Sequence, residues 1–334
     1  MPGSGPVHIG ILGAAGITPT ALVAPVHATG AARLVAIAAR DRARAEQFAR
    51  DHSVERVHDG YAEVLADPNV EAVYIPLPNN LHAKWTMAAL EAGKHVLVEK
   101  PFASNLAEAE RVAEVAAAHP GLVVMEAFHN RYHALARDLQ QLLGDGIIGR
   151  VAEASAIFEI TLPDRGNIRY SHALAGGATM DLGCYCVHML RTLLGEPEVV
   201  AATARTTTDP ELDDALTAEL SFPDEVAASI RCSLDEPRAR QSLRLLGSRG
   251  AIEVDGFVHP QYGNRVTVTI DDQSTSHEVS RTPTTYEAQL TAFVAAVRDG
   301  KPVLTGPDDS LRTMRVLDDL YLAAGLQPRP ASPA

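Results

Sequence analysis

Cysteine is scarce in this sequence, with three residues among 334. Cys184 and Cys186 are separated by one residue and Cys232 is remote, which matches none of the usual spacings of zinc ligands, and an odd number cannot pair completely into disulfides. We therefore expect three free thiols that pack as small apolar side chains in a reducing compartment.

Positive charge is also under-represented. The chain has 29 lysines and arginines against 42 aspartates and glutamates, a net charge of −13, and it contains no dense basic run. A nucleic-acid-binding surface needs a basic stripe, so this composition argues against a nucleic-acid partner. The acidic balance mainly favours solubility.

Long apolar runs are absent as well. Gly, Pro or a charged residue interrupts each run well short of the roughly 20 residues that span a bilayer. Met1 to Pro6 contains no basic stretch of the kind that opens a signal peptide. We expect neither a membrane helix nor a signal peptide. We therefore expect a cytoplasmic protein.

The sequence does contain enough apolar material for two domains, with 46% hydrophobic and 21% charged residues. In the first part, short β-branched runs alternate with helix-like segments, which is typical of a doubly wound parallel sheet. The expected strands are 7–12, 34–38, 72–75, 95–98 and 122–125. The expected helices begin near Thr18 and cover 41–51, 82–92 and 105–118, so residues 1–126 form an α/β domain.

Strands dominate after a helix expected over 132–143. They are expected at 152–161, 199–207, 215–222, 227–234, 242–247, 251–254 and 266–270. Alternation such as Leu243 and Leu245 around Arg244 predicts a mostly antiparallel open sheet with one buried face, in an α+β domain over 127–334. Helices expected over 286–298 and 309–324 are too few to cover both faces, which predicts a homodimer or homotetramer. The Pro-rich end, 327–334, is predicted to be a mobile tail.

A loop of small residues follows the first strand and enters the first helix. The residues expected to approach a pyrophosphate are Gly10, Gly13, Ala14, Ala15, Gly16 and Ile17. Ala15 and Thr18 occupy the second and third glycine positions of G-x-G-x-x-G, so the motif alone also fits a turn without a ligand. Its place in a βαβ unit favours a dinucleotide.

Arg40 follows the second strand, where an acidic residue would bind the ribose 2′-OH and an arginine suits a 2′-phosphate. It therefore favours NADP, with Asp41 left to cap the next helix. Two alternatives stay open. Asp41 could bind the ribose, with NAD as cofactor, or Arg40 could be a solvated surface charge.

Four motifs in order give the chain a family resemblance. They are the glycine loop, Pro76-Leu77-Pro78-Asn79-Asn80-Leu81-His82, Glu99-Lys100-Pro101 and Gly176-Gly177-Ala178-Thr179-Met180-Asp181-Leu182-Gly183-Cys184-Tyr185. The chain resembles the Gfo/Idh/MocA oxidoreductases, and through Glu126-Ala127-Phe128 and Asn167-Ile168-Arg169 the branch of dimeric dihydrodiol dehydrogenase and bacterial sugar oxidoreductases. The resemblance implies an N-terminal Rossmann domain and a C-terminal domain whose large open sheet often forms a dimer interface.

Lys100, Asp181 and Tyr185 are the predicted catalytic residues. Lys100 follows the 95–98 strand, at the edge where doubly wound sheets bind ligands, although it could simply pair with Glu99. Asp181 and Tyr185 are four residues apart and share a face if that stretch is helical. A nearby Lys100 would lower the pKa of Tyr185, which could then exchange the hydroxyl proton while Asp181 orients the alcohol. In the alternative, Tyr185 only packs.

The resemblance assigns further residues. Pro76, Asn79 and His82 border the nicotinamide and Glu99 contacts its ribose or carboxamide, although Asn79 and His82 could instead serve the helix terminus. The substrate residues are Lys100, Phe128, Arg169, Asp181 and Tyr185. His129 and His133 lack the Glu and third ligand of a zinc motif, so no metal is expected. Other candidates for substrate contacts are His129, Asn130, Arg131, Arg165 and His188.

Together these features predict an enzyme that moves a hydride between NADP(H) and a secondary alcohol or hemiacetal of a polyhydroxylated, sugar-like molecule. A trans-dihydrodiol or a cyclitol is an alternative substrate. A non-catalytic NADP-binding sensor is an alternative class of protein, but the presence of Lys100, Asp181 and Tyr185 together counts against it.

Overall fold

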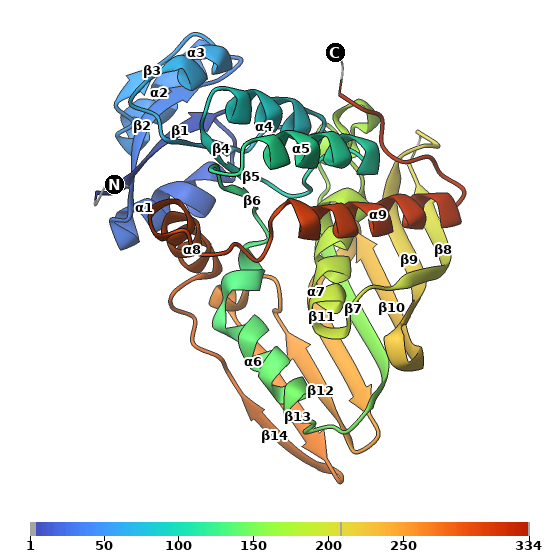
Figure 1. Cartoon of the computed structure of the whole chain (residues 1–334). Coiled ribbons are helices and arrows are strands. Elements are labelled where there is room, and N and C mark those ends of the chain that lie inside the picture. Colours follow the sequence, from blue (N-terminus) through green and yellow to red (C-terminus); the bar gives the residue numbers. More distant parts are fainter. Residues whose placement is uncertain (1–4, 208, 333–334) are drawn as a thin grey trace. The chain divides into compact units, whose positions relative to one another are not determined.

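The computed structural model in Figure 1 describes residues 5–207 and 209–332, so Met1 to Ser4 of the N-terminal segment lie outside the described residues. The chain divides into two compact units. The first comprises residues up to His129, residues 286–311 and the end of the chain from Ala331. The second comprises 130–285 and 312–330. Each unit has its own sheet.

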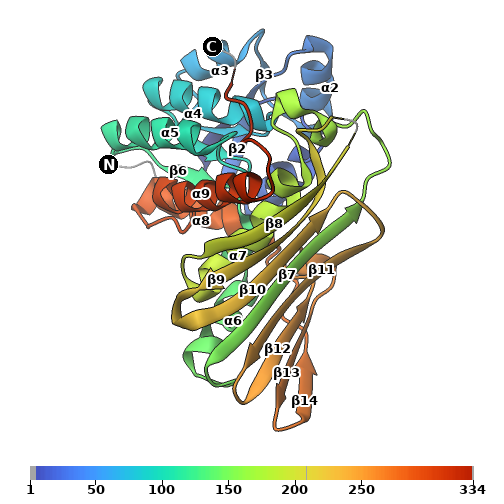
Figure 2. The same ribbon diagram turned by 90° about the vertical axis from the view of Figure 1, so that its right-hand side faces the viewer.

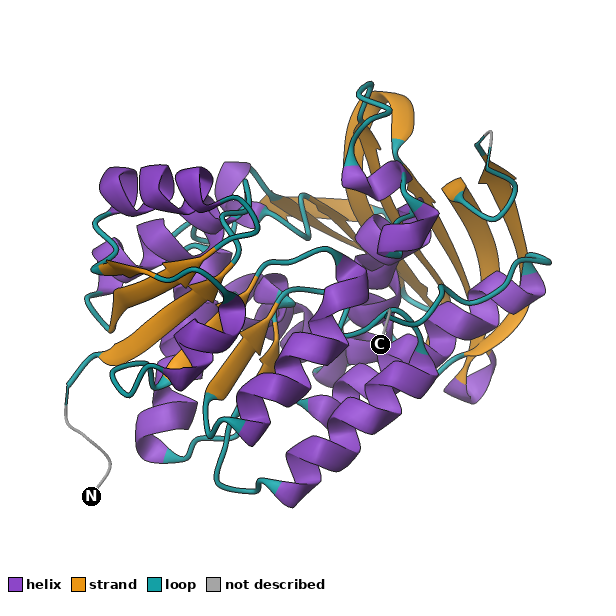
Figure 3. Ribbon diagram, turned by 90° about the horizontal axis from the view of Figure 1, so that it is seen from above, coloured by secondary structure: helices purple, strands orange, loops and turns teal. Residues whose placement is uncertain are grey.

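The first unit contains a six-stranded parallel sheet in the order β3-β2-β1-β4-β5-β6. Its strands are β1 (Val7–Leu12), β2 (Ala32–Ala38), β3 (Arg56–Val57), β4 (Ala72–Ile75), β5 (His95–Val98) and β6 (Val124–Glu126). The strands are almost wholly buried because helices lie on both faces (Figure 3), which explains their apolar, β-branched sequences. The order reverses between β1 and β4, where ligands bind beyond the carboxyl ends.

The helices of the first unit begin largely where the sequence predicts. They are α1 (Ala24–Thr29), α2 (Arg42–His52), α3 (Tyr61–Ala66), α4 (His82–Glu91), α5 (Leu106–Ala118) and most of α8 (Thr285–Asp299). The Asp41 carboxylate accepts from the Ala43 N–H at 2.9 Å and the Asn105 amide oxygen accepts from the Glu108 N–H at 2.9 Å, which confirms both predicted caps. Near Thr18 the structure has a π-helical turn, Pro19–Val23, that leads into α1.

The second unit contains an eight-stranded sheet in the order β14-β13-β12-β11-β7-β10-β9-β8, which Figure 2 shows side by side. Its strands are β7 (Val151–Thr161), β8 (Glu198–Thr206), β9 (Asp213–Phe222), β10 (Val226–Ser233), β11 (Asp235–Gly247), β12 (Gly250–Asp255), β13 (Arg265–Ile270) and β14 (Gln273–His277). Every pair is antiparallel except β7 with β10, which confirms the predicted architecture.

One face of this sheet forms the core of the second unit. The buried residues Leu243 and Leu245 lie opposite Ala156 and Ala154 of β7, as their alternation predicts. Helices α6 (Ala134–Gly144) and α7 (Cys184–Leu194) lie on this face, and α7 contacts β7 and β10. Helix α9 (Pro307–Ala323) begins in the first unit and continues into the second.

The end of the chain differs from its prediction. Arg329 is fully buried in the second unit, and Ser332 donates to the Asn80 carbonyl in the first, so the predicted mobile tail is wrong for 327–332. Proline content marks a chain without regular secondary structure, but it does not show whether a charged side chain within it finds a buried partner. Residues 333–334 lie outside the described part of the chain.

Other sequence expectations have clear outcomes. Cys184, Cys186 and Cys232 are buried free thiols, as predicted, and burial raises the pKa of Cys186 and of Cys232. None of the helices in the described residues is long and apolar enough to cross a membrane.

Candidate active site

The glycine loop occupies the carboxyl end of β1. Gly13 has φ +114°, its N–H donates to the Ala38 carbonyl at 2.8 Å, and a Cβ there would lie 2.9 Å from Leu77 Cδ2. The position therefore needs glycine for its backbone conformation and for its close packing. Gly10 is also required for close packing, because a Cβ would lie 2.6 Å from Val64 Cγ1. Gly16 and Ile17 are exposed, beside the half-buried Ala14 and Ala15.

Two arginines flank this loop. Arg40 is exposed just beyond the carboxyl end of β2. Arg44, in the first turns of α2, donates from Nη2 to the Ala14 carbonyl at 2.9 Å. Sequence analysis missed Arg44, since nothing in a run of alternating charges shows which side chain turns back to the loop. Arg42 has other partners, Glu46 at 2.9 Å and Asp59.

The loops after β4 and β5 carry the next predicted residues. Pro76 is buried, Asn79 begins the 3₁₀ turn Asn79–Leu81 before α4, and the bond between Lys100 and Pro101 is cis. The Tyr74 hydroxyl donates to the Glu99 carboxylate at 2.6 Å. Tyr74, a fully buried strand residue that sequence analysis missed, thus fixes the side chain of Glu99.

His82 lies between these two loops. Its ring is fully buried, with Nδ1 2.7 Å from the Pro101 carbonyl oxygen and Nε2 2.8 Å from the Leu77 carbonyl oxygen. Burial lowers its pKa. The imidazole therefore connects the loop that carries Asn79 to the loop that carries Lys100.

In the second unit, Arg169 and Asp181 meet. Arg169 lies in the 3₁₀ turn Ile168–Tyr170, and its Nε donates to Asp181 Oδ2 at 2.5 Å. Asp181 lies in the π-helical turn Thr179–Gly183, which continues into α7. Tyr185, in the first turn of α7, is 5% exposed, and its ring packs edge-on against Phe158 at 5.7 Å. The contact of Phe158 with Tyr185 was not predicted from the sequence.

These residues are distributed over both units. Lys100 and the fully buried Phe128 belong to the first, and Asp181 and Tyr185 to the second, so an association of Lys100 with Tyr185 stays a prediction. In the first unit, Lys100 follows the carboxyl end of a strand of the parallel sheet. In the second unit, Asp181 and Tyr185 lie at the start of α7.

The remaining candidates have other contacts. The His129 ring packs on Tyr286 at 4.2 Å between centroids, and His133 Nδ1 accepts from the Leu135 N–H at the start of α6. Arg165 pairs with Asp235 and lies over the Tyr170 ring. Asn130 and His188 are buried and Arg131 is half-buried. Among the described residues, no three His, Cys, Asp or Glu side chains are grouped as a metal site requires.

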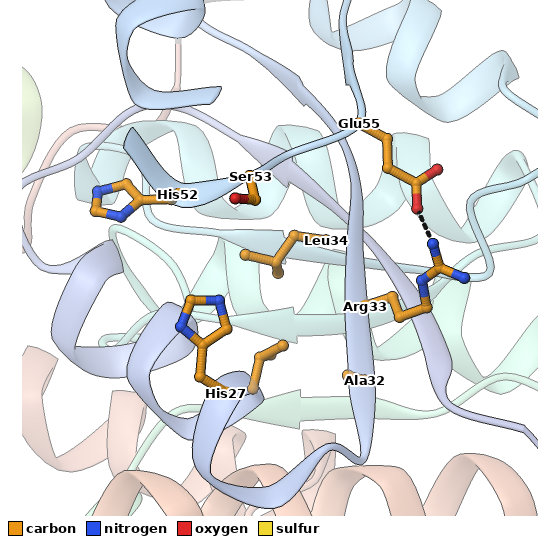
Figure 4. A pocket seen from close by; sticks show the side chains of 8 residues that line it. His27, Ala32, Arg33, Leu34, His52, Ser53 and Glu55 are labelled. Atoms are coloured by element: carbon orange, nitrogen blue, oxygen red, sulfur yellow. Dashed lines mark hydrogen bonds and ion pairs between the residues drawn. The ribbon is translucent and has the colours of Figure 1, made fainter. Parts of the chain in front are cut away.

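A separate hollow of about 290 Å³ lies at the opposite end of β2 (Figure 4). Its lining includes Ala32, Leu34, His27 and His52, and Arg33 is paired with Glu55 at 2.5 Å. Because Arg40 follows the carboxyl end of β2, this hollow is not part of the candidate site.

Comparison with known proteins shows the family of this chain. Residues 7–128 match the model of an oxidoreductase family with an NAD-binding Rossmann fold, and residues 136–253 match the GFO/IDH/MocA C-terminal domain. The chain belongs to the Gfo/Idh/MocA family of oxidoreductases. The first match covers the glycine loop and Lys100, and the second covers Asp181 and Tyr185.

Several members of the Gfo/Idh/MocA family are similar over most of the chain. A D-xylose 1-dehydrogenase (NADP(+)) of Haloferax volcanii is 34% identical over 318 residues, 94% of this chain and 96% of that protein. A 3-ketoreductase from Actinomadura kijaniata, solved in complex with NADP and TDP-benzene, has a TM-score of 0.88 at 29% identity and covers 95% of this chain and 98% of its own. A trans-1,2-dihydrobenzene-1,2-diol dehydrogenase of Macaca fascicularis is 36% identical over 206 residues, 60% of either chain.

Proposed function

We propose that this protein is an NADP-dependent oxidoreductase that interconverts a secondary alcohol or hemiacetal with a ketone or lactone on a sugar-like substrate. The observation that carries the proposal is the Asp181 carboxylate, held by Arg169 in the turn that leads directly to Tyr185. A carboxylate and a phenol at the start of one helix can together bind and deprotonate an alcohol. Relatives named as a xylose dehydrogenase and a ketoreductase support a sugar substrate.

The glycine loop and its arginines fit NADP. The loop after β1 is exposed at Gly16, where an added Cβ would meet nothing within 4 Å, so a pyrophosphate can approach its backbone. The Arg44 guanidinium reaches this loop, and Arg40 lies at the end of the adjacent strand. Two guanidinium groups suit the 2′-phosphate that distinguishes NADP from NAD.

The protein residues supply binding and proton transfer. NADP(H), when bound, supplies or accepts the hydride at its nicotinamide. Asp181, fixed by Arg169, accepts a hydrogen bond from the substrate hydroxyl and orients it. Tyr185 takes the hydroxyl proton in oxidation and returns it in reduction. We propose that Lys100 stabilises the tyrosinate form of Tyr185.

A substrate panel tests this proposal. We expect aldoses, keto-sugars, a cyclitol and a trans-dihydrodiol, each assayed in its feasible direction with NADP(H) and with NAD(H), to reveal turnover with at least one sugar-like compound and a preference for NADP(H). Nicotinamide absorbance measures the rate. Cofactor binding without turnover on any member of the panel would contradict the proposal and favour the sensor alternative. A strong preference for the trans-dihydrodiol would instead assign the dihydrodiol alternative.

Two wider expectations belong to this proposal. We infer a cytoplasmic enzyme, on the basis of composition and free thiols, and an assembly of two or four copies. The self-association rests on the sheet of the second unit, whose β9 and β10 expose alternate residues such as Thr217, Glu219 and Ser229, and we infer that this open face is where copies meet.

A further inference from the structure

A buried ion pair in the second unit joins the end of the chain to the middle of its sequence. Arg329 lies beyond α9 and Asp213 begins β9, and both side chains are 0% exposed. The Arg329 Nη2 donates to Asp213 Oδ1. A buried pair is weak evidence for stability, because two charges have left water. What the pair contacts is therefore more informative than the pair itself.

Arg329 uses the rest of its guanidinium on backbone carbonyls. Nε donates to the Gly176 carbonyl at 2.7 Å and Nη1 donates to the Glu211 carbonyl at 2.6 Å. The guanidinium carbon also lies 4.1 Å from the centroid of the Tyr321 ring. A planar fork can satisfy these acceptors and Asp213 at once, whereas a lysine ammonium is a single point charge. The site is specific for arginine.

Asp213 holds the other side of the same turn. Its Oδ2 accepts from both the N–H and the hydroxyl of Thr179, each at 2.7 Å. Its Oδ1 accepts from the Tyr321 hydroxyl at 3.1 Å. Thr179 opens the π-helical turn that contains Asp181. The ion pair is thus hydrogen-bonded to the chain at Gly176, through Arg329, and at Thr179, through Asp213.

The glycine between these two points shows how closely the turn is held. Gly177 has φ +123°, and a Cβ there would lie 2.1 Å from Asp213 Oδ1 and 2.6 Å from Arg329 Nη2. On the opposite side, the Gly177 N–H donates to the Arg169 carbonyl at 2.8 Å, and a Cβ on Gly176 would lie 2.5 Å from that oxygen. The turn therefore packs closely against the ion pair and against the backbone of Arg169.

We propose that Arg329 and Asp213 are positioning residues for the candidate active site. They fix the turn 176–179, which sets both the backbone of Arg169 and the start of the helix that carries Asp181 and Tyr185. The segment after the last helix is therefore part of the active-site scaffold. This inference rests on the proposed function, and its test includes one measurement that needs no turnover.

Arg329→Lys is the main test, because it keeps the charge beside Asp213 and loses the fork. Arg191→Lys is the matched control: Arg191 is 3% exposed in the same unit and donates to Glu196 at 2.7 Å and to Thr313 at 2.5 Å, away from the turn. Thr179→Val, which removes one donor to Asp213 and leaves the ion pair intact, is the second variant if Arg329→Lys does not fold.

Three readouts are taken on the full chain: kcat and KM with NADPH, NADPH affinity by fluorescence, and hydrogen exchange of residues 166–185 by mass spectrometry. Displacing reacting groups by about 1 Å costs about 10²-fold in rate, so we expect Arg329→Lys to lower kcat by about that factor with unchanged NADPH affinity and faster exchange in 166–185. Arg191→Lys keeps the wild-type kcat and the wild-type exchange in this segment. Thr179→Val also lowers kcat and speeds exchange in 166–185, each by less than Arg329→Lys.

Two results overturn the proposal. One is a kcat of Arg329→Lys equal to that of Arg191→Lys, and the other is unchanged hydrogen exchange in 166–185. If the wild-type protein turns over no substrate, the proposed function fails, and exchange alone then decides whether the ion pair holds the turn.

Discussion

At the scale of single residues, the candidate site depends on local helix caps and on contacts between different elements. Asp41 and Asn105 are recognisable as helix caps because a cap depends only on its next few residues. Arg44, Tyr74 and Phe158 are not recognisable, because each reaches a partner on a different element. Arg169 donates to Asp181 in the structure, and its contact with substrate stays a prediction.

Selectivity for NADP is the first prediction at this scale. Replacing Arg40 with alanine removes a charge-assisted hydrogen bond worth about 1.5–3 kcal/mol, so NADP affinity should fall about tenfold or more while NAD affinity stays constant. Arg42→Ala is the matched control, because Arg42 is engaged with Glu46 and Asp59. Titrating each variant with both cofactors measures the effect. Equal affinity of the wild type for NADP and NAD would refute it.

His82 gives a second prediction. His82→Ala removes a ring whose nitrogens lie 2.7 Å from the Pro101 carbonyl oxygen and 2.8 Å from the Leu77 carbonyl oxygen. A neutral imidazole carries one N–H, so the variant leaves one of these buried oxygens without its donor, at a cost of about 1–3 kcal/mol. We expect a lower melting temperature and weaker cofactor binding, because the loops after β4 and β5 lose their connection. Since burial lowers its pKa, His82 should contribute no titration to the pH profile of kcat above neutrality. A variant that melts and binds NADPH like the wild type would show the connection to be unimportant.

At the scale of elements, periodicity locates the buried strands and helices and misses the short or polar ones. The run Val7–Leu12 is predicted with its observed bounds because it is apolar and ends at a glycine turn. Strand Arg56–Val57 has two residues and Gln273–His277 is polar and exposed, so neither carries a period-2 signal. Sequence also does not show that α8 packs with the first unit, which depends on contacts distant in sequence.

The attachment of α8 predicts a pH dependence. Arg298, in α8, donates to both Glu71 carboxylate oxygens at 2.8 Å, and these hydrogen bonds lower the pKa of Glu71 from its ordinary 4.5. A carboxyl with a lowered folded pKa stabilises the protein above its unfolded pKa, and this stability is lost as pH falls below 4.5 through the folded value. Urea unfolding between pH 6 and about 3 should show a shallower loss in Glu71→Gln than in the wild type. If the free energies of unfolding of the wild type and of Glu71→Gln fall in parallel with pH, Glu71 does not contribute to the loss of stability in acid.

At the scale of the whole molecule, composition and motif order are enough to establish a two-part α/β oxidoreductase. They are not enough to follow the chain to its end, where a Pro-rich segment carries the fully buried Arg329. They also leave the assembly open. We expect light scattering at micromolar concentration, with NADP present, to give the mass of a dimer or tetramer. A monomer mass would refute self-association.

Proton transfer by Tyr185 is the central claim for the molecule, and Tyr185→Phe tests it most directly. The variant keeps the ring that packs on Phe158 and removes only the hydroxyl. With a substrate identified by the panel, kcat should fall by about 10²- to 10⁴-fold, the usual contribution of general acid-base catalysis, with NADPH affinity unchanged. Near wild-type kcat in Tyr185→Phe, with deuterated NADPH showing hydride transfer to be rate-limiting, would contradict the account.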